Sequence, residues 1–245
     1  GDFNPGTNTN NNTTDIYDAD NNLQNKTFTN SNLENTWTNY GANLNMTTKL
    51  DTTGKEPSGN LEYIHYHSLS NQMFVNSFYD DNENKTNDDE ILRGYLPGTI
   101  NIYSGKIDYT HPLKHNAKIE AGLKSSYVET DNIANYDSLL NDKWITDEGK
   151  TNHFLYKENI NAAYVSASKQ LNKKWSAQMG LRLENTISNG NQLTTNETFK
   201  RNYTQLFPTA YISYAMNDKN QFNINCGRRI QRPDYSDLNP FYYFL

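Results

Sequence analysis

Two histidines close together in the first third of the chain could bind a metal ion. His65 and His67 are two residues apart, so in a β-strand both side chains lie on the same face, as two ligands of one site must. No third ligand stands near them in the sequence. A pair of histidines exposed to water or to a lumen is therefore the preferred interpretation.

Oxygen ligands for a hard cation occur at two other places. Asp18, Asp20 and Asn22 begin like a calcium-binding loop, but the glycine and glutamate of the sixth and twelfth loop positions are missing. The acidic stretch 80–90 could hold divalent cations, although a solvated loop is the ordinary interpretation. The sequence therefore predicts no metal site and no cofactor.

Catalytic side chains do not form a recognisable set. Cys226 is the only cysteine, and it alternates with Phe222 and Ile224 on an apolar face. The chain contains no nucleophile elbow, Walker loop, zincin motif or dinucleotide fingerprint. We expect that the protein is not an enzyme, and we assign no catalytic, cofactor-binding or metal-binding residues.

Charged residues that could line a lumen occur near the C-terminal end. Arg182 and Glu184 share the polar face of one predicted strand, and Arg228, Arg229 and Arg232 follow another. If the opposite face of the sheet contacts lipid, these charges pair across strands inside a barrel. Contact with a passing substrate is the alternative.

The elements that must position these residues are long β-strands. Residues 175–184 alternate with a period of two, because Trp175, Met179 and Leu181 fall on one face and polar residues on the other. The alternation predicts an all-β, antiparallel up-and-down meander of about eight long strands, and it favours the wall of a transmembrane β-barrel over a soluble β-protein. The expected strands span 36–50, 59–79, 95–111, 115–129, 154–170, 173–188, 200–216 and 219–232.

The connections between these strands alternate in length. Short turns are expected at 51–54, 111–115, 171–172 and 217–218, and long polar loops at 80–94, 130–153 and 189–199. Outer-membrane barrels have this layout, with short periplasmic turns and longer external loops. A soluble extracellular ligand-binding barrel or sandwich with an apolar interior remains the alternative.

Aromatic residues occur near the ends of the expected strands. Tyrosine and tryptophan rings favour the boundary between membrane and water, so these residues are expected to form an aromatic girdle, with ordinary cross-strand packing as the alternative. The candidates are Trp37, Tyr40, Tyr103, Tyr109, Trp175, Tyr203 and Tyr211.

The composition agrees with a thin barrel wall. Only 34% of the 245 residues are hydrophobic, too few for a thick core but enough for a sheet with one apolar face. A net charge of −6 gives no electrostatic basis for binding nucleic acid.

Residues 1–35 are Asn- and Thr-rich and lack periodicity, so they are expected to form a loop or a disordered segment, with the barrel fragment over 36–245.

Several motifs carry a family resemblance. They include D-Y-T-x-P from Asp108, Y-K-E-N-I-x-A-A-Y from Tyr156, G-L-R-x-E-x-T from Gly180, N-Y-T-x-L-F-P from Asn202 and R-R-I-x-R-P-x-Y-x-x-L-N-P-F from Arg228. In this order and spacing, the set resembles the outer-membrane β-barrel family of Bacteroidetes-type TonB-dependent receptors. The resemblance covers about 36–245 and is strongest after residue 100.

The resemblance implies a place in the cell outer membrane and a function in the uptake of a bulky nutrient such as a siderophore, glycan or peptide. It implies as partners the membrane lipid, an N-terminal plug domain and the TonB system, and an unknown nutrient ligand. No plug or TonB box is evident in the sequence, so we expect a truncated C-terminal barrel portion. Such a fragment would leave open sheet edges, through which self-association is possible.

Overall fold

The computed structural model describes residues 1–232, and these form one antiparallel sheet of ten strands. Among these residues, no helix is long and apolar enough to cross a membrane. The strands are β1 (Asp2–Tyr17), β2 (Leu23–Thr47), β3 (Glu56–Tyr79), β4 (Glu90–Leu113), β5 (Ala117–Leu140), β6 (Lys143–Thr146), β7 (Asn152–Gln170), β8 (Trp175–Gln192), β9 (Glu197–Asn217) and β10 (Asn220–Gly227).

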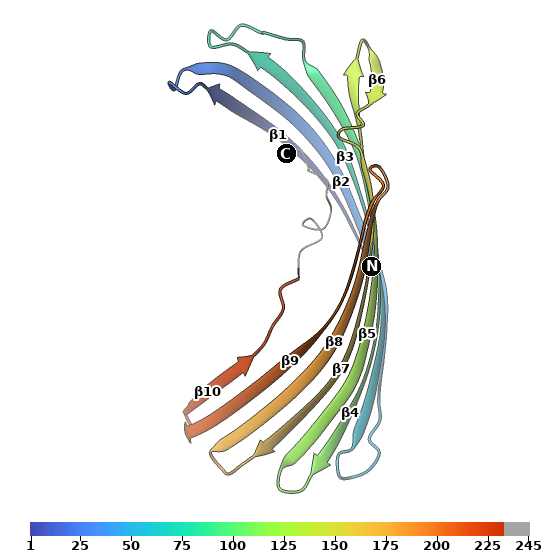
Figure 1. Cartoon of the computed structure of the whole chain (residues 1–245), viewed down its shortest axis with the longest axis vertical. Helices are drawn as coiled ribbons and strands as arrows, with labels where there is room; N and C mark the ends of the chain where they lie inside the picture. The colour runs from blue at the N-terminus through green and yellow to red at the C-terminus, as the bar shows by residue number, and fades with distance from the viewer. Residues whose placement is uncertain (233–245) are drawn as a thin grey trace.

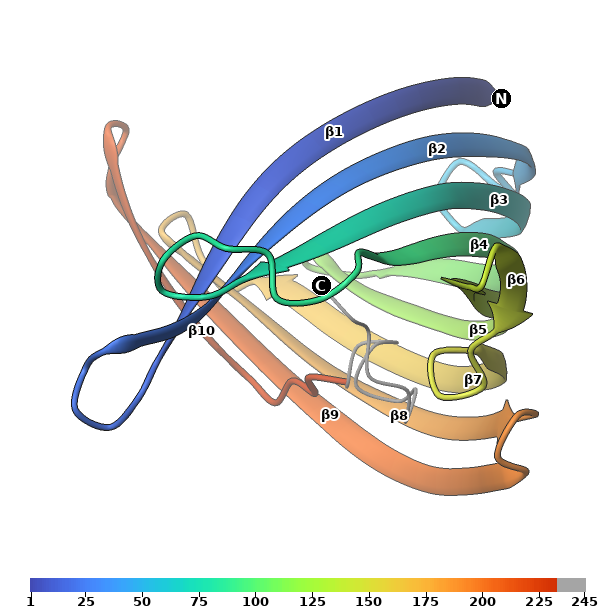
Figure 2. The ribbon, with the colours of Figure 1, turned by 90° about the horizontal axis from the view of Figure 1, so that it is seen from above.

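The strands follow one another across the sheet in the order of the sequence, except that the short β6 pairs only with β5. The sheet curves into an open arc, and residues 228–232, which follow β10, turn back into the concave side (Figures 1 and 2). The all-β, up-and-down fold expected from the alternation is confirmed. Each of the eight expected strands is present, and β1 and β6 are additional.

The interpretation of residues 1–35 as a loop or disordered segment is wrong. β1 pairs with β2 in an unbroken register from Asp2 opposite Asn39 to Ile16 opposite Asn25. Backbone hydrogen bonds do not depend on the side chain, so a polar segment can complete a ladder beside a formed strand. Because β1 is exposed along its whole length, neither face requires apolar residues, and no alternation marks the strand in the sequence.

The strands are also longer than the alternation indicates. β3, β4 and β5 have 24 residues each, and the connection expected over 80–94 shrinks to the ten residues between Tyr79 and Glu90. At about 3.3 Å per residue and a tilt of about 45°, such a strand rises about 55 Å, whereas the lipid-facing band of an outer-membrane barrel is about 25 Å tall. About half of each long strand therefore stands beyond the apolar band.

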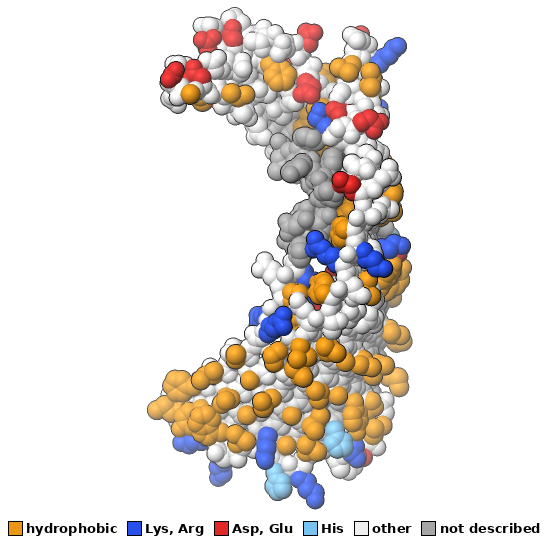
Figure 3. Space-filling view, viewed as in Figure 1, with side chains coloured by type: hydrophobic (Ala, Val, Ile, Leu, Met, Phe, Trp, Pro, Cys, Tyr) orange, Lys and Arg blue, Asp and Glu red, His pale blue; other side chains and the backbone are white. Residues whose placement is uncertain are grey.

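The apolar side chains of the lower half lie on the convex face. Met179 is 69% exposed, and Trp175 and Leu181 are 40% and 43% exposed, so they do not fill a closed core. The register places apolar residues of neighbouring strands side by side on this face, because Ile107 lies opposite Leu123, and Leu183 opposite Leu206. Hydrophobic side chains gather over the lower ends of the strands, with Lys and His below them (Figure 3). This orientation contradicts a soluble barrel with an apolar interior.

On the concave face, aromatic rings lie over glycines of the neighbouring strand. Gly94 lies opposite Tyr136, Gly122 opposite Tyr164, and Gly190 opposite Phe199. A Cβ atom built on Gly190 would lie 2.1 Å from the ring of Phe199, so the glycine leaves the space that the ring occupies. Phe154 packs near the same ring, at 6.4 Å between centroids, and is fully buried. No second layer of structure covers this face among the described residues, and the aromatic rings pack directly against the sheet.

Substitution of Gly190 tests this packing. Gly190→Val is expected to destabilise the sheet by about 1–3 kcal/mol, because the added carbons must displace the Phe199 ring. In a double-mutant cycle with Phe199→Ala, the two changes are expected to be non-additive by at least about 0.5 kcal/mol. Equilibrium unfolding of the chain in lipid vesicles measures both values, and additive effects would contradict the contact.

The lower turn between β2 and β3 is held by an acidic side chain. The Asp51 carboxylate accepts hydrogen bonds from the Thr53 hydroxyl at 2.5 Å and the Thr53 amide at 2.9 Å, and Lys55 lies 3.0 Å from it. Gly54 adopts a φ of 92°, which favours glycine. The hydrogen bonds from Thr53, followed by the interaction with Lys55, hold the pKa of Asp51 well below its ordinary value of 3.8.

This turn predicts a pH dependence. Because the pKa is lower in the folded state, the carboxylate stabilises the turn above the unfolded-state value of 3.8 and loses this effect as the pH falls toward the folded-state value. The difference in unfolding free energy between the wild type and Asp51→Asn should be constant above about pH 5 and shrink below about pH 4. Paired denaturation curves measure it, and a difference that grows on acidification would contradict the assignment.

Candidate functional site: the charged lumenal face

The concave face of β4, β7, β8 and β9 carries a network of charged and aromatic side chains. Alternation along each strand and the register between strands bring Asp108 beside Gly122, Gly122 beside Tyr164, and Tyr164 beside Arg182. These residues lie at the same level as the apolar band, on the opposite side of the wall. The contributing side chains are Lys106, Asp108, Tyr164, Arg182, Glu184 and Phe207.

Glu184 is the centre of the network. It is 8% exposed and accepts hydrogen bonds from Nε and Nη2 of Arg182 at 3.0 and 2.8 Å. Its second carboxylate oxygen accepts a hydrogen bond from Arg232, in the segment that returns into the concave side after β10. Of the five charged residues that the sequence analysis grouped in a lumenal network, Arg182, Glu184 and Arg232 are thus in direct contact.

A second group of contacts continues the network toward β4. Lys106 lies 2.8 Å from Asp108, and the Tyr164 hydroxyl donates to the same carboxylate. The Arg182 guanidinium lies over the Tyr164 ring, 5.6 Å from its centroid. Lys106, Asp108 and Tyr164 were not among the site residues predicted from the sequence. The signal available was the spacing of Lys106 and Asp108, which places opposite charges two residues apart on one face.

A hollow of about 640 Å³ opens above this network. Among residues 1–232, the charged residues of its lining are six cations and one carboxylate, Glu184. Arg228 is one of these cations. Its guanidinium lies 5.7 Å from the centroid of the Phe207 ring and donates a hydrogen bond to the Leu206 carbonyl. The cations that line it are Lys106, Lys124, Arg182, Arg228, Arg229 and Arg232.

Polar atoms near the network remain without a hydrogen-bond partner in the described part of the chain. They are Thr186 Oγ1, Gln205 Oε1 and Arg232 Nε, and Thr186 is 1% exposed. Buried polar atoms are usually satisfied. The face around Glu184 therefore offers both charge and hydrogen-bonding groups to a further molecule or segment.

The convex face carries a row of tyrosines at the upper edge of the apolar band. Tyr63 lies 5.0 Å from Tyr103, and Tyr103 lies 6.3 Å from Tyr127, between ring centroids. Tyr40 extends the row, 6.3 Å from Tyr63, and stacks on His65 at 4.6 Å. A row of this kind fits the boundary between membrane and water.

The aromatic girdle predicted from the sequence is partly correct. Tyr40 and Tyr103 lie in the row, and Tyr109 and Trp175 lie on the same convex face near the lower turns. Because side chains alternate along a strand, the register places the remaining three candidates on the concave face. These three are Trp37, Tyr203 and Tyr211.

Comparison with known families decides where this wall belongs. Residues 48–245 match the model of the outer membrane protein beta-barrel family. The chain belongs to this family. Its place is accordingly the cell outer membrane, as predicted. The match includes residues 233–245, which lie outside the described residues and hold the end of the R-R-I-x-R-P-x-Y-x-x-L-N-P-F motif.

Solved structures of larger receptors resemble the chain. The unliganded ferric citrate transporter FecA matches with 14% identity and a TM-score of 0.44, over 91% of this chain and 41% of that one. The ferric yersiniabactin uptake receptor FyuA from Yersinia pestis matches with 10% identity and a TM-score of 0.40, over 88% and 40%. The siderophore receptor PiuA from Acinetobacter baumannii matches with 11% identity and a TM-score of 0.39, over 89% and 48%.

The chain thus spans less than half the length of each of these receptors. No curated protein matches it.

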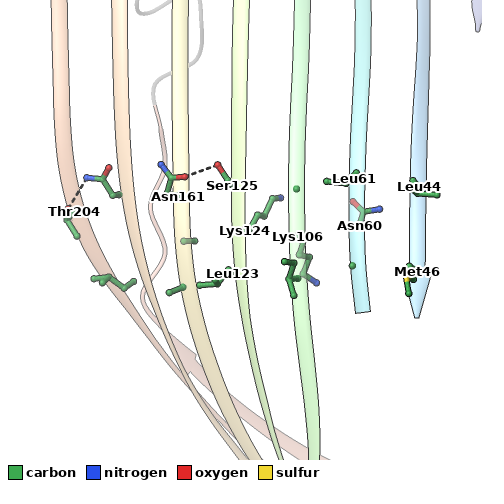
Figure 4. Close-up of a pocket in the computed structure, with 17 residues that line it drawn as sticks. Leu44, Met46, Asn60, Leu61, Lys106, Leu123, Lys124, Ser125, Asn161 and Thr204 are labelled. Carbon is green, nitrogen blue, oxygen red and sulfur yellow. Dashed lines mark hydrogen bonds between the residues drawn. The ribbon is translucent and has the colours of Figure 1, made fainter. Parts of the chain in front are cut away.

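As expected of an outer membrane beta-barrel protein, the lipid-facing band has little polar surface. A shallow groove of about 880 Å³ crosses it, with Leu44, Leu61 and Leu123 along its length (Figure 4). Gly59, Gly105 and Ala163 also line it. Ser125 donates to Asn161 at its upper margin, where the apolar band ends.

The residues considered as metal ligands are used in other contacts. His65 lies 2.8 Å from the Asn101 side-chain oxygen, and His67 lies 3.4 Å from the Thr99 hydroxyl. Asp18 accepts hydrogen bonds from the amides of Asp20 and Asn22, which close the turn between β1 and β2. Within residues 1–232 the structure contains no group of three or more metal-ligating side chains.

Proposed function

We propose that the chain is the barrel portion of a TonB-dependent outer-membrane receptor that takes up a bulky nutrient. The siderophore, glycan and peptide classes are the candidates. The observation that carries the proposal is the charged network around Glu184. This network lies on the concave face of the sheet, at the same level as the lipid-facing band on the convex face. A wall with a purely structural lumen would not need a cationic hollow and unpartnered polar atoms at this depth.

The partners in this proposal are a plug domain and the TonB system. The lumenal face supplies arginines and amides to a plug or to a solute that passes it. The motifs that resemble TonB-dependent receptors support this assignment, as does membership of the outer membrane beta-barrel family.

Uptake in cells tests the proposal. A strain that lacks the complete gene containing this chain should lose growth on one nutrient of a panel of siderophores, glycans and peptides, and Arg182→Gln in the complete protein should reduce uptake. Loss of TonB should have the same effect as loss of the gene. Full growth on every member of the panel, or uptake independent of TonB, would contradict the proposal. Lys26→Gln, on the convex face, serves as the control.

We further propose that the sheet edges pair with additional strands. Within residues 1–232, β1 covers β2 only as far as Asn39, and β10 covers β9 only from Thr209 onward. The backbone of 40–47 and of 197–205 thus has one free side among the described residues, and such edges associate. In detergent, cross-linking should capture dimers or a closed smaller barrel. A monomer with open edges in plain buffer would contradict this expectation.

A further inference from the structure

A polar hollow of about 420 Å³ lies on the convex face beyond the tyrosine row. We call it the outer-wall hollow. Alternation and register place its side chains on the same side of the sheet as the lipid-facing band, since Met73 lies opposite Arg93 and Arg93 opposite Asp137. Its other outward residues are Asn32, Glu34, Asn71, Tyr95 and Asn135.

Arg93 is fixed at the upper end of this hollow. Its Nε and Nη2 atoms lie 2.9 and 2.8 Å from the same Asp137 oxygen, and the guanidinium lies 4.4 Å from the centroid of the Trp144 ring. Thr146 donates to the other Asp137 oxygen at 3.0 Å. The β5–β6 hairpin, which pairs Asp137 with Thr146, thereby holds an aromatic ring, a cation and a carboxylate together.

The chemistry of the outer-wall hollow suits neutral hydroxyl groups. Tyr95 is 51% exposed and offers a flat ring, and Asn71 and Asn135 offer amide donors and acceptors. Asp137 neutralises Arg93, and Glu34 adds another carboxylate, so the hollow has no excess positive charge for a phosphate. An aromatic ring beside amides and a carboxylate is a combination that recognises a sugar.

The position of the hollow indicates where that sugar comes from. Tyr95 is eight residues beyond Tyr103 on the same face of β4, which is about 26 Å along the strand and about 19 Å above the tyrosine row at a tilt of about 45°. A solute in the lumen cannot reach this surface, because the sheet lies between them. The surface continues the lipid-facing wall outward, so its neighbours are the headgroups that project from the outer leaflet.

We propose that the outer-wall hollow binds the saccharide headgroup of an outer-leaflet glycolipid. The sugar ring stacks on Tyr95, and its hydroxyls bond to the amides and to the Arg93–Asp137 pair. The glycolipid then encloses the receptor wall above the acyl chains. This site is separate from the lumenal network and does not depend on the uptake function.

Binding of a deacylated, dephosphorylated core oligosaccharide to the chain in detergent micelles tests the proposal. Saturation-transfer NMR should show contact with the sugar, and Tyr95→Ala and Trp144→Ala should each weaken binding by about ten-fold. Tyr95→Phe should bind within about two-fold of the wild type, which separates loss of the ring from misfolding. Tyr17→Ala is the matched control, because Tyr17 is 53% exposed at the tip of β1, and it should have no effect.

The proposal would be overturned by absence of binding by the wild type, by equal losses in Tyr95→Ala and Tyr17→Ala, or by displacement of the sugar by inorganic phosphate. Binding to phospholipid vesicles without sugar that is reduced by Tyr95→Ala would likewise assign the surface to lipid in general and refute the saccharide.

Discussion

Leu181→Arg is expected to lower the unfolding free energy of the membrane-inserted chain by about 2–4 kcal/mol. Leu181 lies on the convex face, near the middle of the apolar band on β8, and its side chain is 43% exposed. Lipid therefore surrounds it, and a guanidinium there loses its hydration. Denaturant unfolding of the chain in phospholipid vesicles measures the change.

The same strand provides the control. Gln178→Arg introduces the same side chain three residues away but on the concave face, where the chain itself already carries Arg182. We expect a change within about 0.5 kcal/mol, typical of an exposed site. If Gln178→Arg were as destabilising as Leu181→Arg, the assignment of the two faces would be wrong.

Glu184→Leu is expected to destabilise the chain by about 1–3 kcal/mol, because it leaves Arg182 and Arg232 without their shared carboxylate. Breaking a fully buried pair costs more, but the two arginine side chains are 32% and 30% exposed, and water screens part of the effect. Unfolding in vesicles at neutral pH, compared with the wild type, gives the value.

An exposed ion pair on the same concave face serves as the comparison for Glu184. Lys118 lies 2.9 Å from Glu120, and their side chains are 48% and 37% exposed. Glu120→Leu should cost less than about 1 kcal/mol, as is usual for such pairs. Equal costs for Glu120→Leu and Glu184→Leu would show that the network around Glu184 has no special role in holding the segment after β10 against the wall.

The lower half of the sheet was predictable because each face meets a different environment. Lipid on one side requires residues such as Met179 and Leu181, water on the other permits Gln178, and the alternation reports this difference. Beyond the band, both faces of β1 and β2 meet polar surroundings. The physical reason for alternation is then lost, and backbone pairing forms strands that the side chains do not reveal.

The lumenal site was predictable only within one strand or segment. Arg182 and Glu184 are two residues apart, so their shared face follows from the sequence. Contact between Tyr164 and Asp108 depends on the register of two strand pairs, which the turn geometry fixes and the composition does not. The orientation of Trp37 could have been predicted, since it is an odd number of residues from Leu44, an outward residue of the same strand.

The sequential order of the strands also governs how the wall can form. Each strand pairs with the next strand in the sequence, except that β5 pairs with β7 across the short β6. Each pairing therefore needs the closure of only a short segment, such as the three residues between β4 and β5. The entropy lost on closing such segments is small. We therefore expect the sheet to assemble by successive addition of hairpins, in which the tight lower turns align the strands and the pairing then extends upward from the band.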